Sequence, residues 1–139
     1  MTYTFDENIV SDLHKDARGY RPSSYWWEDW RLSSDEWKQT IWDNLCKELE
    51  AEMARQRQAD DMAMIAFHQR VQGLMCVGAK DEAQAIKWIV EAEGFDKFDL
   101  MYGADYFCFN LDLPYSAKNE YPIQNVINEL LSSMEEENV

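Results

Sequence analysis

The pattern of apolar and polar residues between positions 33 and 77 predicts one unusually long helix. Its first apolar residues recur every four positions, which places them along one helical face: Trp37, Ile41, Leu45, Leu49 and Met53. Met62, Ile65, Val71 and Leu74 resume an apolar face further along. Ser33 stands three residues before Glu36, the spacing of a capping box at a helix start. We therefore expect Trp37, Ile41 and Leu45 to be buried.

Between the two apolar segments lies a polar stretch, residues 54–61. It is compatible with one continuous helix of roughly 40 residues, or with a break at Asp60, which could cap a second helix. The stretch contains no Gly or Pro, and all its residues except the two Asp are good helix formers. We favour continuity, so that a helix over about 34–77 organises the fold.

Three other segments carry helical patterns. In residues 6–17, Asp6 can cap a short amphipathic helix, and Gly19 ends it. Residues 81–92 begin with acids, as a helix N-terminus favours, and are followed by Gly94. Residues 121–131 begin with Tyr121-Pro122 and form a final amphipathic helix.

Residues 95–115 fit two structures. Read with period two, residues 106–111 form a strand, and a turn at 103–105 completes a small β-hairpin near 98–111. Read with period 3.6, Asp99 caps a helix in which Leu100, Ala104, Phe107 and Leu111 share one face. We prefer the helix because a lone hairpin is weakly stable. The expected fold class is all-α, a helical bundle on one long helix, with the hairpin as the alternative.

Length and cysteine usage suggest a single intracellular domain. The 139 residues predict one helical domain over 1–139, with a tail at 132–139 that frays. Cys46, Cys76 and Cys108 have no metal-ligand spacing, so we expect reduced core thiols. No signal sequence opens the chain, and no apolar run approaches the roughly 18 residues of a membrane span. We expect a cytoplasmic protein without membrane contact.

The charge balance narrows the choice of partner. The chain has 27 acids against 13 bases, a net charge of −14, which repels nucleic acid and anionic membranes. The expected partner is a protein with a basic, nucleic-acid-binding surface, and solubility alone is the simpler alternative. The acids expected to contribute lie opposite the apolar face or at the helix start: Asp35, Glu36, Asp43, Glu50, Asp60 and Asp61.

Five of the six tryptophans fall between residues 26 and 42. They could form a local aromatic core that fixes the first helix against the long one. They could also anchor an interface, because Trp is enriched among binding hot spots. We take Trp26, Trp27 and Trp30 as candidate binding residues. Adjacent side chains cannot face the same interior, so at least one of Trp26 and Trp27 should be partly exposed.

Recognisable catalytic motifs are missing from the sequence. There is no glycine-rich nucleotide loop, zinc-protease helix or nucleophile elbow. His14 and His68 have no Cys or Asp partner at ligand spacing. Glu48 and Glu52 share a helical face, but a di-metal site would also need Glu-x-x-His pairs. We expect no enzymatic activity, no metal and no cofactor.

Two segments resemble a family of small proteins encoded by tailed bacteriophages. The first is Phe5-Asp6-Glu7-Asn8-Ile9-Val10-Ser11-Asp12-Leu13-His14-Lys15-Asp16-Ala17-Arg18-Gly19-Tyr20-Arg21-Pro22, and the second is Tyr102-Gly103-Ala104-Asp105-Tyr106-Phe107 with Leu113-Pro114-Tyr115. Together they cover about a third of the chain. The resemblance implies a phage origin and carries over no functional residues.

Small acidic phage proteins often bind and disable host machinery, including restriction and CRISPR–Cas complexes. By analogy, we expect a non-enzymatic inhibitor of a host nucleic-acid-handling defence complex, acting in the host cytoplasm. Two mechanisms are open: mimicry of DNA by arrayed acids, or steric blocking through an aromatic anchor. The alternative function is a structural or assembly protein of the phage particle. The oligomeric state is left open, a homodimer included.

Overall fold

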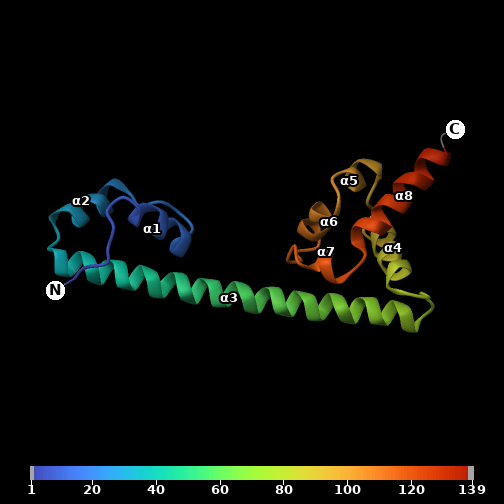
Figure 1. Ribbon diagram of the computed structural model, residues 1–139, viewed down its shortest axis with the longest axis horizontal. Coiled ribbons are helices and arrows are strands. Elements are labelled where there is room, and N and C mark those ends of the chain that lie inside the picture. Colours follow the sequence, from blue (N-terminus) through green and yellow to red (C-terminus); the bar gives the residue numbers. More distant parts are fainter. Residues whose placement is uncertain (1, 138–139) are drawn as a thin grey trace. The chain divides into compact units, whose positions relative to one another are not determined.

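The computed structural model describes residues 2–137, in which eight helices and no strand occur. They are α1 (Val10–Arg18), α2 (Ser24–Leu32), α3 (Asp35–Cys76), α4 (Glu82–Ala92), α5 (Lys97–Met101), α6 (Ala104–Asn110), α7 (Ala117–Glu120) and α8 (Ile123–Glu137) (Figure 1). The all-α prediction is therefore confirmed. Contacts group the chain into two compact units, residues 1–58 and 59–139, which we call the first and second unit.

Helix α3 runs unbroken through residues 54–61, as the absence of Gly and Pro predicted. Its first turn is capped by Ser34, whose hydroxyl accepts a hydrogen bond from the Trp37 N–H at 3.1 Å. Ser33 instead ends α2, and its hydroxyl donates to the Asp29 carbonyl at 2.6 Å. The predicted cap at Ser33 is thus wrong by one residue, because two consecutive serines divide the end of one helix and the start of the next.

In the first unit, α1 and α2 lie along the N-terminal part of α3 (Figure 1). Val10, Trp30 and Leu45 form the buried centre, one from each helix. Around them pack seven partly buried apolar side chains: Phe5, Leu13, Ala17, Trp26, Trp27, Ile41 and Trp42. The predicted cap at Asp6 is wrong, because α1 begins only at Val10 and has no side-chain cap; the Asp6 carboxylate instead accepts a hydrogen bond from the Asn8 N–H at 2.8 Å in the preceding turn. Gly19 ends the helix, as predicted, with φ of +86°. Glycine adopts this left-handed conformation at little energetic cost, because it has no Cβ atom.

The predicted burial of Trp37 on the apolar face of α3 is wrong. Leu45 is fully buried and Ile41 half-buried, but the Trp37 side chain is 57% exposed and Met53 is also exposed. A four-residue step turns the helix by about 400°, so each step moves the side chain about 40° around the axis. Over the sixteen residues from Trp37 to Met53 the two ends of the row therefore rotate away from the buried line through Leu45.

The second unit packs α4 to α8 and the part of α3 after residue 58 around a larger core. Val71, Ile86, Ile89, Ile123 and Ile127 are among its fully buried residues. The Phe67 ring meets Phe107 and Tyr121 edge-on, at centroid distances of 6.3 and 5.1 Å. Of the apolar face predicted on this part of α3, Val71 is buried and Leu74 half-buried, whereas Met62 and Ile65 are exposed. Phe67, which was not part of the predicted face, is buried in this core instead.

Residues 95–115 form two short helices and a turn. Asp96 and Asp99 make a reciprocal capping box at the start of α5, and Gly103 separates α5 from α6 with φ of +86°. The helical alternative is correct for this segment and the hairpin is not formed. The single helix capped by Asp99 is wrong, because Gly103 leaves the helical conformation. Leu100, Ala104 and Phe107 are buried and Leu111 is half-buried, so the four residues that the helical pattern placed on one face all pack in or against the core.

Three further expectations concern the chain as a whole. Helix α8 continues to Glu137, so residues 132–137 of the predicted frayed tail are helical, and 138–139 lie outside the described residues. The behaviour of residues 1–139 as one cooperative domain stays a prediction. Within residues 2–137, no helix combines the length and apolar character that crossing a bilayer requires.

The three cysteines are free and differ in exposure. Cys108 is buried, Cys46 half-buried and Cys76 exposed. Burial, with the nearby Asp105 carboxylate, raises the pKa of the Cys108 thiol, which reduces its reactive thiolate fraction. The expectation of a core thiol is thus correct for Cys108 and wrong for Cys76, because the last residue of α3 lies at the surface.

Candidate interaction surfaces

The tryptophans of α2 belong mainly to the core of the first unit. Trp30 is 2% exposed, and Trp26 stacks on it with centroids 5.3 Å apart. Trp27 meets Trp26 edge-on at 5.1 Å, and the Lys38 ammonium lies 5.5 Å from the Trp30 ring centroid. Trp26 and Trp27 are both half-buried, which agrees with the expected partial exposure. These contacts favour the local aromatic core over a binding anchor, because Trp30 has no surface to offer.

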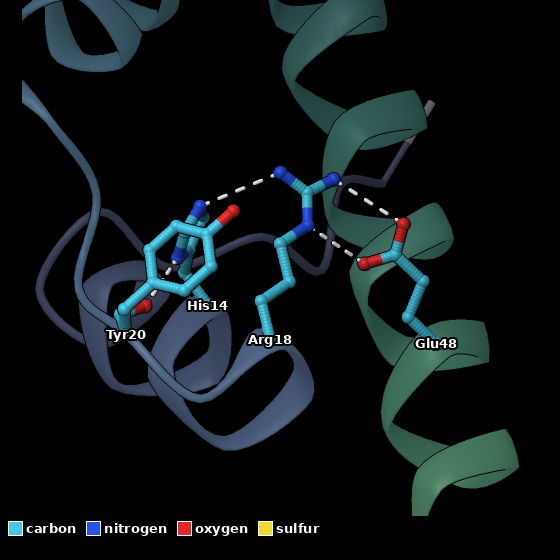
Figure 2. Close-up of polar contacts among 4 residues, drawn as sticks. All are labelled: His14, Arg18, Tyr20 and Glu48. Carbon is cyan, nitrogen blue, oxygen red and sulfur yellow. Dashed lines mark hydrogen bonds and ion pairs between the residues drawn. The ribbon is translucent and has the colours of Figure 1, made fainter.

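A polar network joins α1 to α3 beside this core (Figure 2). The buried His14 ring donates from Nδ1 to the Tyr20 carbonyl at 2.7 Å and accepts at Nε2 from Arg18, 3.4 Å away. Arg18 also donates two hydrogen bonds to the Glu48 carboxylate, at 2.8 and 3.2 Å. Both imidazole nitrogens are therefore used, and the role of His14 is structural.

We expect Glu48→Gln to destabilise the first unit by about 0.5 kcal/mol at neutral pH, since both partners are more than a third exposed and water screens the pair. The hydrogen bond from Arg18 lowers the pKa of the Glu48 carboxyl. That stabilisation is present above the unfolded value of about 4.3 and is lost as pH falls through the lower folded pKa. Urea titrations of the unaltered protein and the variant, between neutral and acidic pH, should show that the difference in their free energies of unfolding shrinks as pH falls. Glu50→Gln, on the same helix, is the control, and an equal loss there would contradict the pairing.

The candidate acids of the first unit lie on the exposed side of α3. Asp35, Glu36, Asp43 and Glu50 are all exposed, although Asp43 also accepts a hydrogen bond from Gln39 at 2.8 Å. Glu36, Asp43 and Glu50 recur every seven residues, about 10.5 Å apart along the axis, and drift by only about 20° per step. They therefore form one row on this helix.

The remaining two candidate acids belong to the second unit and differ from each other. Asp61 is exposed, whereas Asp60 is half-buried. Successive helical residues point about 100° apart, so one of two adjacent acids turns toward the packed side. Asp60 is for this reason a weaker binding candidate than the sequence pattern implied.

Most of the negative charge belongs to the second unit. Residues 59–139 hold 15 acids against 5 bases, a net charge of −10, whereas residues 1–58 hold 12 acids against 8 bases, a net charge of −4. Two of the five bases are already paired, Arg70 with Glu93 at 2.9 Å and Lys118 with Asp105 at 2.7 Å. The acids occur at a similar frequency in both units, so the second unit owes its larger net charge to its scarcity of bases. Electrostatic attraction to a basic partner is therefore concentrated in the second unit.

The second unit also exposes an apolar face that the sequence patterns did not single out. On α5, Phe98 and Met101 are exposed, as is Tyr102 at its C-terminal end. The Tyr102 ring contacts Tyr106 of α6, centroid to centroid at 5.1 Å, and Phe109 of α6 is exposed as well. We call these five residues the α5–α6 face.

A compositional signal could have found this face. Residues 95–115 hold seven aromatic side chains, more than one helical face can bury. Leu100, Ala104 and Phe107, which the helical pattern grouped on one face, are the buried positions. The aromatic residues left over at 98, 102 and 109 must then lie outside.

Neither a cluster of metal ligands nor a similar protein points to a particular chemistry for this chain. Among residues 2–137, no three His, Cys, Asp or Glu side chains gather as metal ligands would. Glu48 and Glu52, which share a helical face, each form an ion pair with an arginine, Arg18 and Arg55 respectively. No protein family model, curated protein or solved structure matches this chain.

Proposed function

We propose that this protein is a non-enzymatic inhibitor that binds a basic, nucleic-acid-binding surface of a host defence complex of the CRISPR–Cas or restriction type. The observation that carries this proposal is the net charge of −10 on the second unit. A surface of that charge attracts basic protein surfaces over distances of about a Debye length and speeds their association. The phage resemblance of two segments supports the choice of a host target.

Charge density distinguishes the two inhibitory mechanisms. Between Glu36 and Glu50 the α3 axis advances about 21 Å. Duplex DNA carries about 12 phosphates over that length, at one charge per 1.7 Å. The exposed row on α3 offers three acids there, Glu36, Asp43 and Glu50. We therefore favour steric blocking guided by charge, rather than a phosphate-by-phosphate mimic.

The test compares equal charge reversals in the two units, against a partner captured from host lysate, identified and then purified. Asp61→Lys/Glu91→Lys/Glu120→Lys changes three exposed acids of the second unit. We expect it to weaken affinity at least ~10-fold at about 50 mM salt, with the loss shrinking at about 500 mM as ions screen the surfaces. Surface plasmon resonance at both salt concentrations measures this.

The matched control is Glu28→Lys/Asp43→Lys/Glu50→Lys, which changes three exposed acids of the first unit by the same total charge. We expect the control to cost less than ~3-fold, because the charge of its unit is closer to neutral. Equal losses would mean that net charge alone governs binding. If neither triple variant nor salt changes the affinity, the proposed electrostatic mechanism is wrong.

The second candidate is a structural or assembly protein of the phage particle. The exposed apolar α5–α6 face favours it, because contiguous exposed apolar surface marks interaction sites of many kinds. Mass spectrometry of purified particles decides between the two. Stoichiometric amounts of the chain in the particle would support assembly, and its absence from particles would support the inhibitor.

A further inference from the structure

We propose that the α5–α6 face is the anchor that seats a basic, amphipathic helical segment of the partner protein. This inference rests on the proposed function and makes it more specific, because it names the contact surface and the chemistry of the segment. The face consists of Phe98, Met101, Tyr102, Tyr106 and Phe109, all within the second unit.

The first argument is the continuity of the face. Phe98, Met101 and Tyr102 stand at positions i, i+3 and i+4, so they share one side of a helical turn. Tyr102 meets Tyr106 at 5.1 Å across the bend at Gly103. Phe109 follows Tyr106 three residues later on α6, one turn further along the helix. Two short helices thereby present one row of large apolar side chains.

The second argument is rigidity. The half-exposed Tyr106 ring meets Phe95 edge-on at 6.3 Å, and Phe95 stacks on the buried Phe107 at 5.7 Å. The capping box of Asp96 and Asp99 fixes the start of α5. The Gln124 side chain accepts a hydrogen bond from the Ala104 N–H at 2.9 Å and so ties α6 to α8. An anchor held in this way loses little conformational freedom on binding, which favours affinity.

The third argument is that folding leaves these side chains exposed. Phe98 and Tyr102 are each 71% exposed, while the opposite side of the same two helices supplies Leu100, Ala104 and Phe107 to the core. Burying a large apolar side chain contributes about 1.5–3 kcal/mol. The α5–α6 face thus holds unused apolar surface, which a partner can cover.

Charge identifies the kind of partner. The segment 95–112 that forms the face contains four acids, Asp96, Asp99, Asp105 and Asp112, and a single base, Lys97. Lys118 pairs with Asp105 from outside the segment, so acids still outnumber bases by two. An occupant therefore gains most if it combines an apolar stripe with surrounding Lys or Arg. A second copy of this chain would bring another unit of net charge −10 against the same acidic rim, and would be repelled.

The test uses a synthetic peptide of about 18 residues, with Leu and Trp at helical spacing on one side and Lys elsewhere. A scrambled peptide of equal composition but without an apolar side is the reference. Fluorescence anisotropy measures both against the full chain. We expect the patterned peptide to bind at least ~10-fold more tightly than the scrambled one, about 1.4 kcal/mol. Phe98→Ser/Met101→Ser/Tyr102→Ser should abolish that preference.

The matched control is Tyr25→Ser/Leu32→Ser/Trp37→Ser, which removes three exposed apolar side chains from the first unit. It should keep the full preference. Amide chemical shifts of the unaltered protein provide a second measurement that needs no variant. On addition of the patterned peptide, they should move mainly in residues 96–112.

Three results would overturn the inference. The Phe98→Ser/Met101→Ser/Tyr102→Ser protein, here called the α5 variant, could still prefer the patterned peptide, or the control variant could lose that preference. The amide shift changes could also map outside residues 96–112. A dimer of the unaltered protein in sedimentation that the α5 variant abolishes would make a second copy the occupant. These outcomes are separate from those of the charge reversals. If the reversals have no effect and the α5 variant still fails to bind the purified partner, the electrostatic function is wrong and the anchor stands.

Discussion

Replacing Trp30 by Ala is expected to destabilise the first unit by about 3–5 kcal/mol, the usual cost of removing a large aromatic side chain from a core. Trp30 is 2% exposed. Its ring stacks on Trp26, meets Phe5 edge-on at 5.7 Å and lies under the Lys38 ammonium. The substitution leaves a cavity at the point where α1, α2 and α3 meet. Urea denaturation followed by far-UV circular dichroism measures the loss.

Trp37→Ala is the control for Trp30→Ala. The same chemical change at a side chain that is 57% exposed should cost less than about 1 kcal/mol. The apolar row read from the sequence would instead give Trp37 the cost of a core residue. Equal losses for the two variants would mean that the burial of Trp30 and the exposure of Trp37 are assigned wrongly.

Replacing Phe107 by Ala is expected to cost the second unit about 3–5 kcal/mol as well. Phe107 is 1% exposed and joins three parts of the core, because its ring stacks on Phe95 and meets Phe67 edge-on at 6.3 Å. Phe67 lies on α3 and Phe107 on α6, so removing the ring of Phe107 breaks a contact between elements that are far apart in the sequence. Thermal and urea unfolding measure the change.

Phe109→Ala is the control, two residues away on the same helix and 67% exposed. It should change stability by no more than about 0.5 kcal/mol, the usual range for surface positions. The pair thus separates folding from binding, because Phe109 belongs to the α5–α6 face and Phe107 to the core. A large loss at Phe109 would remove the basis for an anchor that is free to bind.

These core variants also test the expectation of one domain. If residues 1–139 unfold cooperatively, Trp30→Ala and Phe107→Ala will each shift a single common transition. If the two units unfold independently, each variant will shift the transition of its own unit and leave the other in place. Tryptophan fluorescence reports mainly on the first unit, which holds five of the six tryptophans, and circular dichroism reports on both.

Local signals in the sequence determined the helices. The all-α class, the unbroken α3 through residues 54–61 and the glycine that ends α1 follow from residue preferences and hydrogen-bonding needs within a few positions. The grouping of Leu100, Ala104 and Phe107 on one side of the chain is also correct, although Gly103 divides the predicted helix into two. Such features depend on neighbours in the chain, so the sequence alone is sufficient.

Tertiary packing decided which of several plausible side chains are buried. A row with four-residue spacing on α3 is wider than the surface its partners cover, so α1 and α2 bury Leu45 and leave Trp37 exposed. The same holds for the candidate site. The tryptophans of α2 pack mostly in the core of the first unit. Phe98, Tyr102 and Phe109 are exposed, whereas Leu100, Ala104 and Phe107 of the same segment fill the core of the second unit. Exposure depends on what the rest of the chain brings into contact, and no local pattern contains that information.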